Sequence, residues 1–349
     1  MKELQGKRVY VGLSGGVDSA VSAALLLQAG ADVTGVFIKG WYPPGMPCTW
    51  AAERRDAMRV AASLHIPFHT LDASAEYKKG VIDYLLSEYE VGRTPNPDVM
   101  CNKEVKFGAF YEFARAQGAN YIATGHYAQQ VDGKLLRGPD ESKDQSYFLW
   151  AISPDALAHT LFPVGGLPKT EVRRLAKHFR IPVAEKRDSQ GICFLGSVSV
   201  DEFLRKEFEP IAGNALDQNG NKVGTHDGAV LYTLGARATL HNAEQGPWYV
   251  VSKDMLANTV TVSKDQFTAV TTTKIRLRDT NFFAQYANDT QWSEELTAQY
   301  RYHGPRIEGM FDFDAHTFAP SYSLQEIPAS GQSLVLYKAD ECIGGGIIV

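Results

Sequence analysis

Two cysteines lie in segments whose composition favours a reactive thiol. Cys101 lies near the end of a proline-rich segment, residues 94–102, that is predicted to be a loop, and it is followed by Lys103 and Lys106, where the pattern predicts the start of a helix. Positive charge and a helix N-terminus both lower the pKa of a thiol and favour the nucleophilic thiolate. Cys193 lies in a Ser/Gly turn, where a mobile thiol could collect a sulfur atom and deliver it. Buried structural cysteines remain an equal alternative at both positions.

The remaining cysteines, Cys48 and Cys342, lack such surroundings and are predicted to be structural. The four cysteines are widely scattered, so they form neither a disulfide framework nor a C-x-x-C metal site. We therefore predict no metal centre built from these cysteines.

A second group of chemically capable residues is the run Ser14-Gly15-Gly16-Val17-Asp18-Ser19. It follows the apolar segment 9–13 and precedes the alanine-rich segment 20–29, which predicts a strand, a tight turn and a helix. Such a turn directs backbone N–H groups and a helix N-terminus at one point, where a polyphosphate can bind. Glycine permits the close approach because it has no Cβ.

The loop lacks the lysine of G-x-x-x-x-G-K-[ST] and does not match G-x-G-x-x-G. It resembles the SGGxDS loop of enzymes that split ATP between its α and β phosphates. Ser14 and Ser19 add hydroxyl donors, and we expect Asp18 to hold a metal or to brace the loop. An ordinary strand–helix turn with small residues is the alternative.

A basic segment covers residues 169–187. Its seven basic side chains outnumber two glutamates and are Lys169, Arg173, Arg174, Lys177, Arg180, Lys186 and Arg187. A phosphate-binding surface and a solvated helix face are equally compatible with this charge pattern.

The order of predicted elements indicates the fold. Strand patterns over 32–38, 68–71 and 121–123 alternate with helix patterns over 52–64, 77–90 and 105–117. This alternation predicts an α/β fold with a doubly wound parallel sheet, which binds ligands at the carboxyl ends of its strands. The phosphate loop and Gly125-His126 both follow predicted strands, so we expect them to border one crevice.

The pattern changes near residue 201, beyond which short β runs alternate with turn residues. We predict three domains: 1–200, a small β-rich central module over 201–267, and a C-terminal β-barrel over 268–349. In the 349 residues, no window holds the ~18 apolar residues of a membrane span, and no signal-peptide core precedes the first strand. The expectation is a cytoplasmic protein with no membrane partner.

Six motifs in this order, taken together, resemble the tRNA-specific 2-thiouridylase family over nearly the whole chain. They are SGGVDS, TPNPDVMCN, ATGHYA, KDQSYFL, SQGICF and the terminal GGG. The resemblance implies a Rossmann-like domain of the adenine nucleotide alpha hydrolase type that adenylates its substrate. One departure is Ala236, where the family usually has glutamine, which puts an RNA contact at that point in doubt.

The resemblance also implies roles for individual residues. ATP, with Mg²⁺, would lie on the residues Gly12, Leu13, Ser14, Gly15, Gly16, Val17, Asp18, Ser19, Ile38 and Gly125. Cys101 would be the nucleophile, Cys193 the persulfide carrier and Asp98 the proton-transfer group, with a Cys101–Cys193 disulfide as one product. The tRNA would contact Asn96, Pro97, Asp98, His126, Lys143, Asp144, Gln145, Arg301, Tyr302 and Gln332.

The implied reaction is ATP-dependent 2-thiolation of the wobble uridine, position 34, in tRNAs for lysine, glutamate and glutamine. The sulfur donor would be a cysteine desulfurase or a relay protein. Two alternatives remain: another pyrophosphate-loop enzyme, which thiolates a different base or forms an amide on a small molecule, and a catalytically silent RNA-binding protein.

Overall fold

The computed structural model describes residues 4–45, 50–187, 198–265, 273–283, 293–322, 324 and 328–349. Cys48 and Cys193 therefore lie outside the described residues. In the described part, no helix has both the length and the apolar content that a membrane crossing requires.

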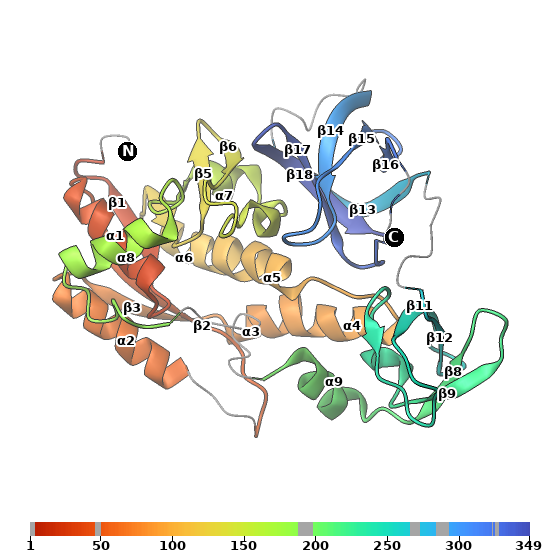
Figure 1. Ribbon diagram of the computed structural model, residues 1–349. Helices are drawn as coiled ribbons and strands as arrows, with labels where there is room; N and C mark the ends of the chain where they lie inside the picture. Colours follow the sequence, from red (N-terminus) through yellow and green to blue (C-terminus); the bar gives the residue numbers. More distant parts are fainter. Residues whose placement is uncertain are drawn as a thin grey trace.

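The N-terminal sheet is parallel throughout, as predicted (Figure 1). Its order is β3-β2-β1-β4-β7. The strands are β1 (Arg8–Gly12), β2 (Asp32–Lys39), β3 (Phe68–Asp72), β4 (Tyr121–Ala123) and β7 (Thr160–Leu161). One face packs on α1 (Val17–Gln28), α2 (Trp50–Ser63) and α8 (Lys169–His178), and the other on the helices of residues 74–116. This two-sided burial explains the apolar strands and confirms the doubly wound α/β class.

Two long helical stretches cover the second face. The first is α3 (Ser74–Tyr77), η1 (Lys78–Asp83) and α4 (Tyr84–Glu90); the second is α5 (Pro97–Met100), η2 (Cys101–Ala109) and α6 (Phe110–Ala116). The prediction of a loop over residues 94–102 is thus wrong beyond Asn96. Asn96 is extended and its side chain accepts a hydrogen bond from the Val99 amide (3.3 Å), so it caps a helix whose first residue is Pro97. Proline is favoured there because its fixed φ suits a first turn.

A short hairpin and two further helices complete the first half of the chain. They are β5 (Ala128–Val131), β6 (Lys134–Arg137), α7 (Pro154–Ala158) and the 3₁₀ turn η3 (Ser146–Leu149). The sequence patterns did not predict the hairpin.

The central module follows α9 (Val200–Phe208) and has its own sheet. Its strand order is β10-β11-β12-β8-β9. The strands are β8 (Gly213–Leu216), β9 (Lys222–His226), β10 (Arg237–Ala238), β11 (Trp248–Asp254) and β12 (Thr259–Ser263), with the 3₁₀ turn η4 (Ala229–Leu231) between β9 and β10. A small core around Trp248, Val250 and Val260 holds it together.

The C-terminal strands close into an antiparallel barrel, because β13 pairs with both β16 and β18. They are β13 (Ile275–Phe282), β14 (Ser293–Gln299), β15 (Ile307–Asp312), β16 (Thr317–Pro320), β17 (Ser333–Lys338) and β18 (Glu341–Ile348). The glycines of β18 allow this closure: a Cβ on Gly344 would overlap the carbonyl oxygen of Asn281 on β13.

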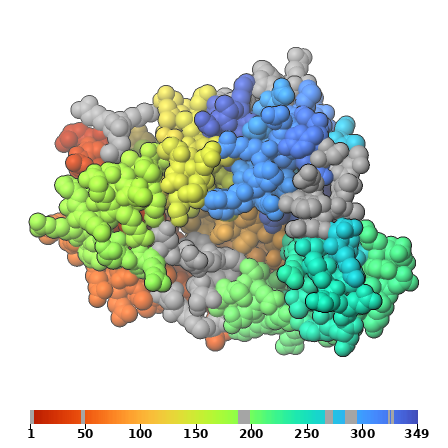
Figure 2. All heavy atoms as spheres, viewed as in Figure 1, coloured from red at the N-terminus to blue at the C-terminus, as the bar shows by residue number. Residues whose placement is uncertain are grey.

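The hairpin β5–β6 extends the barrel sheet, since β6 pairs with β18 at Leu135 and Leu136. Figure 2 shows this hairpin region in yellow directly against the blue barrel, with the teal central module below. A continuous sheet therefore joins the first half of the chain to its last strand.

Candidate nucleotide and RNA site

The glycine loop is preformed around its own hydroxyl groups. Ser14 Oγ and Ser19 Oγ lie 3.2 Å apart, the Gly16 amide donates to Ser14 Oγ (3.3 Å), and Ser19 Oγ donates to the Gly16 carbonyl (3.2 Å). Gly15 has φ +76°, and a Cβ there would lie 2.5 Å from the Glu53 carbonyl oxygen, so this turn requires glycine. Gly16 is the N-cap residue of α1, and no side chain caps this end of the helix. The helix N-terminus is thus open to an anion.

The other predicted nucleotide residues meet this loop. A Cβ on Gly125, the second residue after β4, would lie 2.6 Å from the Ser19 amide nitrogen. A Cβ on Gly12 would lie 3.8 Å from the Ile38 side chain and 3.6 Å from Phe110. The ends of β1, β2 and β4 therefore form one edge of the sheet, as expected from the topology.

The carboxylate of Asp18 is held in place by hydrogen bonds from two side chains. Lys169 Nζ donates to both carboxylate oxygens (2.7 and 2.8 Å), and the Tyr127 hydroxyl donates to Oδ1 (2.8 Å). Lys186 Nζ donates to the Gly15 carbonyl (3.0 Å) and pairs with a further carboxylate, Asp56 (2.8 Å). Sequence reasoning found the basic segment but could not assign these two lysines to the loop.

The rest of the basic segment is divided. Arg173 donates to the carbonyls of Ala184 and Lys186, which fixes the segment's own backbone. On the surface of α8, Arg174 forms an ion pair with Glu171 of the same helix, and Lys177 forms one with Glu185, which follows the helix. Arg174 and Lys177 thus fit the solvated helix face, whereas Lys169 and Lys186 contact the glycine loop and its surroundings. Among the described residues, no group of three or more His, Cys, Asp or Glu side chains could hold a metal.

Cys101 lies inside a helix rather than at its start. It is 1% exposed and belongs to an apolar cluster that includes Val99, Phe110 and Tyr147. The expected helix N-terminus is displaced to Pro97, so Asp98 is in the first turn and Cys101 follows it. The dipole effect on Cys101 is therefore weaker than the sequence suggested, because it falls off within one turn.

Asn102 is buried beside Cys101. Its Nδ2 donates to the Phe148 carbonyl (3.0 Å), while its Oδ1 has no partner among the described residues. A buried amide oxygen without a partner is costly, and such groups are often kept for a ligand or a water. Sequence reasoning did not single out this residue.

His126 is a buried, neutral histidine. Its Nδ1 lies 2.7 Å from Thr124 Oγ1, and its ring packs against Phe107 and Phe162. Burial, and secondarily the positive charge of Lys106, hold its pKa well below the ordinary value. It can therefore contact RNA as a hydrogen-bonding group but not as a cation.

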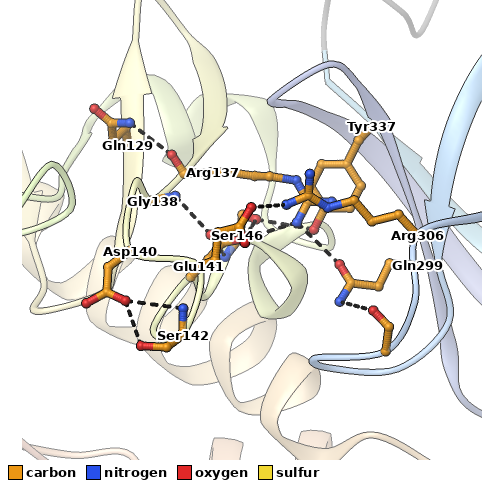
Figure 3. Close-up of polar contacts among 12 residues, drawn as sticks. Gln129, Arg137, Gly138, Asp140, Glu141, Ser142, Ser146, Gln299, Arg306 and Tyr337 are labelled. Carbon is orange, nitrogen blue, oxygen red and sulfur yellow. Dashed lines mark hydrogen bonds and ion pairs between the residues drawn. The ribbon is translucent and has the colours of Figure 1, made fainter. Parts of the chain in front are cut away.

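Of residues 143–145, Asp144 is buried and its two neighbours are half-buried. Asp144 accepts hydrogen bonds from the Gly138 amide (3.0 Å), the Ser146 amide (3.1 Å) and hydroxyl (3.0 Å), and from Arg137 (3.2 Å). Figure 3 shows Arg137, Gly138 and Ser146 gathered around these contacts. Gln145 accepts from the Tyr127 amide (3.0 Å). The Lys143 amide donates to the Asp140 carbonyl (2.9 Å).

A cavity of about 760 Å³ lies between the turn that follows β6 and the loop that follows β14. Its walls include Arg137, Asp144, Gln299 and Tyr302. Tyr302 is 37% exposed, its ring lies 4.5 Å from that of Phe148, and its neighbour Arg301 is exposed. No lining residue belongs to the glycine loop, so this cavity is distinct from the predicted nucleotide site.

Gln332 reaches the segment that leads to Cys101. Its Nε2 donates to the carbonyls of Thr94 (2.7 Å) and Pro95 (3.2 Å). It is therefore placed beside Asn96, Pro97 and Asp98, which are all half-buried. Of the residues predicted to form the site, Cys193 alone lies outside the described part of the chain.

Comparison with protein families covers almost the whole chain. Residues 7–197 match the family described as tRNA methyl transferase HUP domain, residues 201–264 the tRNA methyl transferase PRC-barrel domain, and residues 272–348 the aminomethyltransferase beta-barrel domain.

Individual relatives match at full length. The chain is 40% identical to the tRNA-specific 2-thiouridylase MnmA of Streptococcus uberis over 355 residues, which are 98% of this chain and 95% of that protein. The proteins of the same name from Stenotrophomonas maltophilia and Shouchella clausii are 43% and 39% identical. Those alignments cover 98% and 100% of this chain, and 93% and 98% of the relatives.

Proposed function

The chain belongs to the tRNA-specific 2-thiouridylase family, and from this we propose that it catalyses ATP-dependent 2-thiolation of the wobble uridine, position 34, of tRNA. The observation that carries the proposal is the position of Cys101 relative to the glycine loop. Phe110, which packs beside Gly12 at the end of β1, lies nine residues after Cys101 on the same helical stretch. Cys101 therefore lies about two helical turns along this stretch from the residue that packs beside the loop.

We propose that the loop from Gly12 to Ser19 binds the phosphates of ATP, and that Ile38 and Gly125 contact the nucleoside. Lys169 and Lys186 would provide the positive charge that the loop itself lacks, since both already donate to it. Mg²⁺ would arrive with the nucleotide and neutralise phosphate charge. Asp18 is a carboxylate at the loop that fits this ion, if Lys169 moves from Asp18 to a phosphate.

The proposed chemistry begins at the uracil C2 oxygen, which is a poor leaving group. Attack of this oxygen on the α phosphate releases pyrophosphate and leaves an O-adenylated base. A persulfide on Cys193 then supplies sulfur. Cys101 either attacks this persulfide, which yields a Cys101–Cys193 disulfide and hydrosulfide that displaces AMP from C2, or acts on the base directly. Asp98, one turn before Cys101, is placed for proton transfer.

We infer that Cys193 acts within reach of both sites, because one flank of its segment contacts the glycine loop and the other is buried in the large apolar core that also includes Cys101. Before the segment that carries it, Lys186 contacts the glycine loop. After it, Val198 is buried in the apolar cluster that contains Cys101. Val198 lies five positions after Cys193, and five steps of extended chain span at most about 18 Å.

The tRNA is proposed to enter from the side of the cavity, over Lys143, Arg301 and Tyr302. The target base would leave its stack to reach Asn96, Pro97 and Asp98, as in other base-modifying enzymes. His126 would line this path as a neutral group. The domain division proposed is a catalytic unit over 1–200 and RNA-binding units over 201–267 and 268–349. The tRNAs for lysine, glutamate and glutamine are the proposed substrates.

The test is a reaction of the purified chain with unmodified tRNA, ATP and a cysteine desulfurase, followed by mass spectrometry of the nucleosides. We expect 2-thiouridine at position 34, and none without ATP. A methylated uridine would instead favour the activity in the description of the matching family. Turnover of a small carboxylate, independent of Cys101, would favour an amide synthetase. Repeating the reaction with a relay protein in place of the desulfurase identifies the sulfur donor.

A further inference from the structure

The segment Thr94-Pro95 is a junction where three parts of the molecule meet. The Thr94 amide donates to the Ser330 carbonyl of the barrel (2.8 Å), and the Thr94 hydroxyl lies 3.4 Å from that of Thr233 in the central module. Thr94 itself follows α4 of the N-terminal domain. The backbone that leads to Asn96, Pro97 and Asp98 is therefore held by residues more than a hundred positions away in the sequence.

Gln332 supplies the most direct of these contacts. Its Nε2 donates to two consecutive carbonyls, Thr94 (2.7 Å) and Pro95 (3.2 Å), so one amide group spans the peptide between them. Pro95 is buried, and its carbonyl would otherwise lose a hydrogen bond on burial. The carboxamide nitrogen of Gln332 is thus committed to the protein backbone.

The backbone around Gln332 is hydrogen-bonded to the last strand of the barrel. The Gly331 amide donates to the Ile348 carbonyl (2.9 Å), and the Ile348 amide donates to the Gln332 carbonyl (2.8 Å). A Cβ on Gly331 would lie 2.9 Å from the Thr94 nitrogen, and Gly331 has φ +91°. The two backbones are therefore in direct contact, and the turn beside Gln332 requires glycine.

The contact continues into the residues proposed to bind the base. The Ser333 carbonyl, next to Gln332, accepts a hydrogen bond from the Tyr147 hydroxyl (3.0 Å), and Tyr147 belongs to the buried apolar cluster that contains Cys101. Asn96, directly after Pro95, caps the helix that begins at Pro97 and leads into Cys101. A shift of the barrel at Gln332 would consequently move the start of this helix.

We propose that Gln332 is a positioning residue, which fixes the start of the Cys101 helix against the C-terminal barrel instead of serving mainly as an RNA contact. This inference rests on the proposed function for its catalytic consequence. If Gln332 has this role, base thiolation depends on the contact between the barrel and residues 94–95, whereas ATP binding at the glycine loop does not depend on that contact.

The experiment compares Gln332→Met and Gln332→Glu in the full chain, with Gln218→Met as control. Methionine keeps the length of the side chain without a donor, and glutamate directs a carboxylate at two carbonyls. Gln218 is exposed in a turn of the central module. The measurements are the thiolation rate at saturating tRNA with sodium sulfide as sulfur source, the Kd for tRNA, and hydrogen exchange of peptides covering residues 94–104.

We expect the saturated rate to fall about three- to tenfold in Gln332→Met, as for one lost hydrogen bond, and further in Gln332→Glu. The Kd should stay within twofold, and exchange in residues 94–104 should accelerate. The control should match wild type in all three measurements.

A raised Kd with an unchanged saturated rate would overturn the proposal in favour of an RNA contact, and so would unchanged exchange. If wild type forms no 2-thiouridine, the proposed function fails, and the exchange data alone then decide whether Gln332 anchors the helix. Should Gln332→Met not fold, Gln332→Asn, which shortens the reach, replaces it with the same expectations.

Discussion

The glycine loop and the segment 94–101 are built in opposite ways. The loop is held by bonds among Ser14, Gly16 and Ser19, all within six residues of one another. The segment 94–101 depends on the barrel through Ser330 and Gln332. The proposed phosphate site is therefore built within the first half of the chain, whereas the proposed base site also needs the contacts of the C-terminal barrel. Defects in docking should separate ATP binding from thiolation.

The largest difference between the effects on ATP binding and on thiolation is expected for variants of the two cysteines that are proposed to react. Cys101→Ser and Cys193→Ala should each lower 2-thiouridine formation by about a thousandfold or more, because loss of a nucleophile removes the covalent route. ATP affinity, measured by calorimetry, should not change.

Cys342→Ala is the matched control for these variants. Burial raises the pKa of the Cys342 thiol to about 12, so this cysteine is protonated and inert at neutral pH. Thiolation should be retained in this variant. Normal thiolation by Cys193→Ala would remove the persulfide carrier from the mechanism.

Docking itself can be broken at Glu88, which is 6% exposed in its side chain and lies between Arg93 (2.7 Å) and Arg278 (2.6 Å) of the barrel. Glu88→Gln should lower the free energy of unfolding by about 3 kcal/mol, because two arginines lose their buried partner. Urea unfolding at pH 7 measures this loss, with the exposed Glu308→Gln as control. A change no larger than that of the control would contradict a docking role.

The same carboxylate predicts a pH dependence. Burial acts to raise the pKa of Glu88, but hydrogen bonds from Arg93 and the charge of Arg278 outweigh it, and the pKa is lowered. Its contribution is thus present above the ordinary glutamate pKa and is lost as the pH falls through the lowered value. Wild type should lose more stability on acidification below about pH 4 than Glu88→Gln does. Parallel losses would show that other groups dominate.

For the glycine loop, Lys169→Met should weaken ATP binding about tenfold to a hundredfold, as expected for a lost charge-assisted hydrogen bond. Lys177→Met is the control, because Lys177 lies on the same helix but pairs with the exposed Glu185. The Kd for tRNA should be unchanged in both variants. Equal ATP affinities in the two would exclude Lys169 from the phosphate site.

The smallest effect is expected at Arg301, which is exposed beside the cavity. Arg301→Ala should weaken tRNA binding about three- to tenfold at low salt and flatten its salt dependence, since one phosphate contact is lost. Arg276→Ala removes an equally exposed arginine of the barrel and serves as comparison. Equal losses in both would indicate a general charge effect.

Local patterns were enough to predict the glycine loop, the parallel sheet and the C-terminal barrel. Each depends on contacts between near neighbours or on a hydrophobic period, and such information is contained in short stretches of chain. The helix start at Pro97 was also encoded locally, in Asn96 followed by proline, but the preference of residues before proline for extended backbone led to a loop prediction beyond it.

The amino-acid sequence by itself thus determined which chemical groups the protein carries and the strand edge that gathers its phosphate loop. Only the tertiary structure decided that Lys169 neutralises Asp18, that β6 extends the barrel sheet, and that Gln332 anchors the Cys101 helix. These contacts join residues separated by 151, 207 and 238 positions at their widest. At such separations no local period or propensity records a pairing, because the partners are chosen by how whole domains pack.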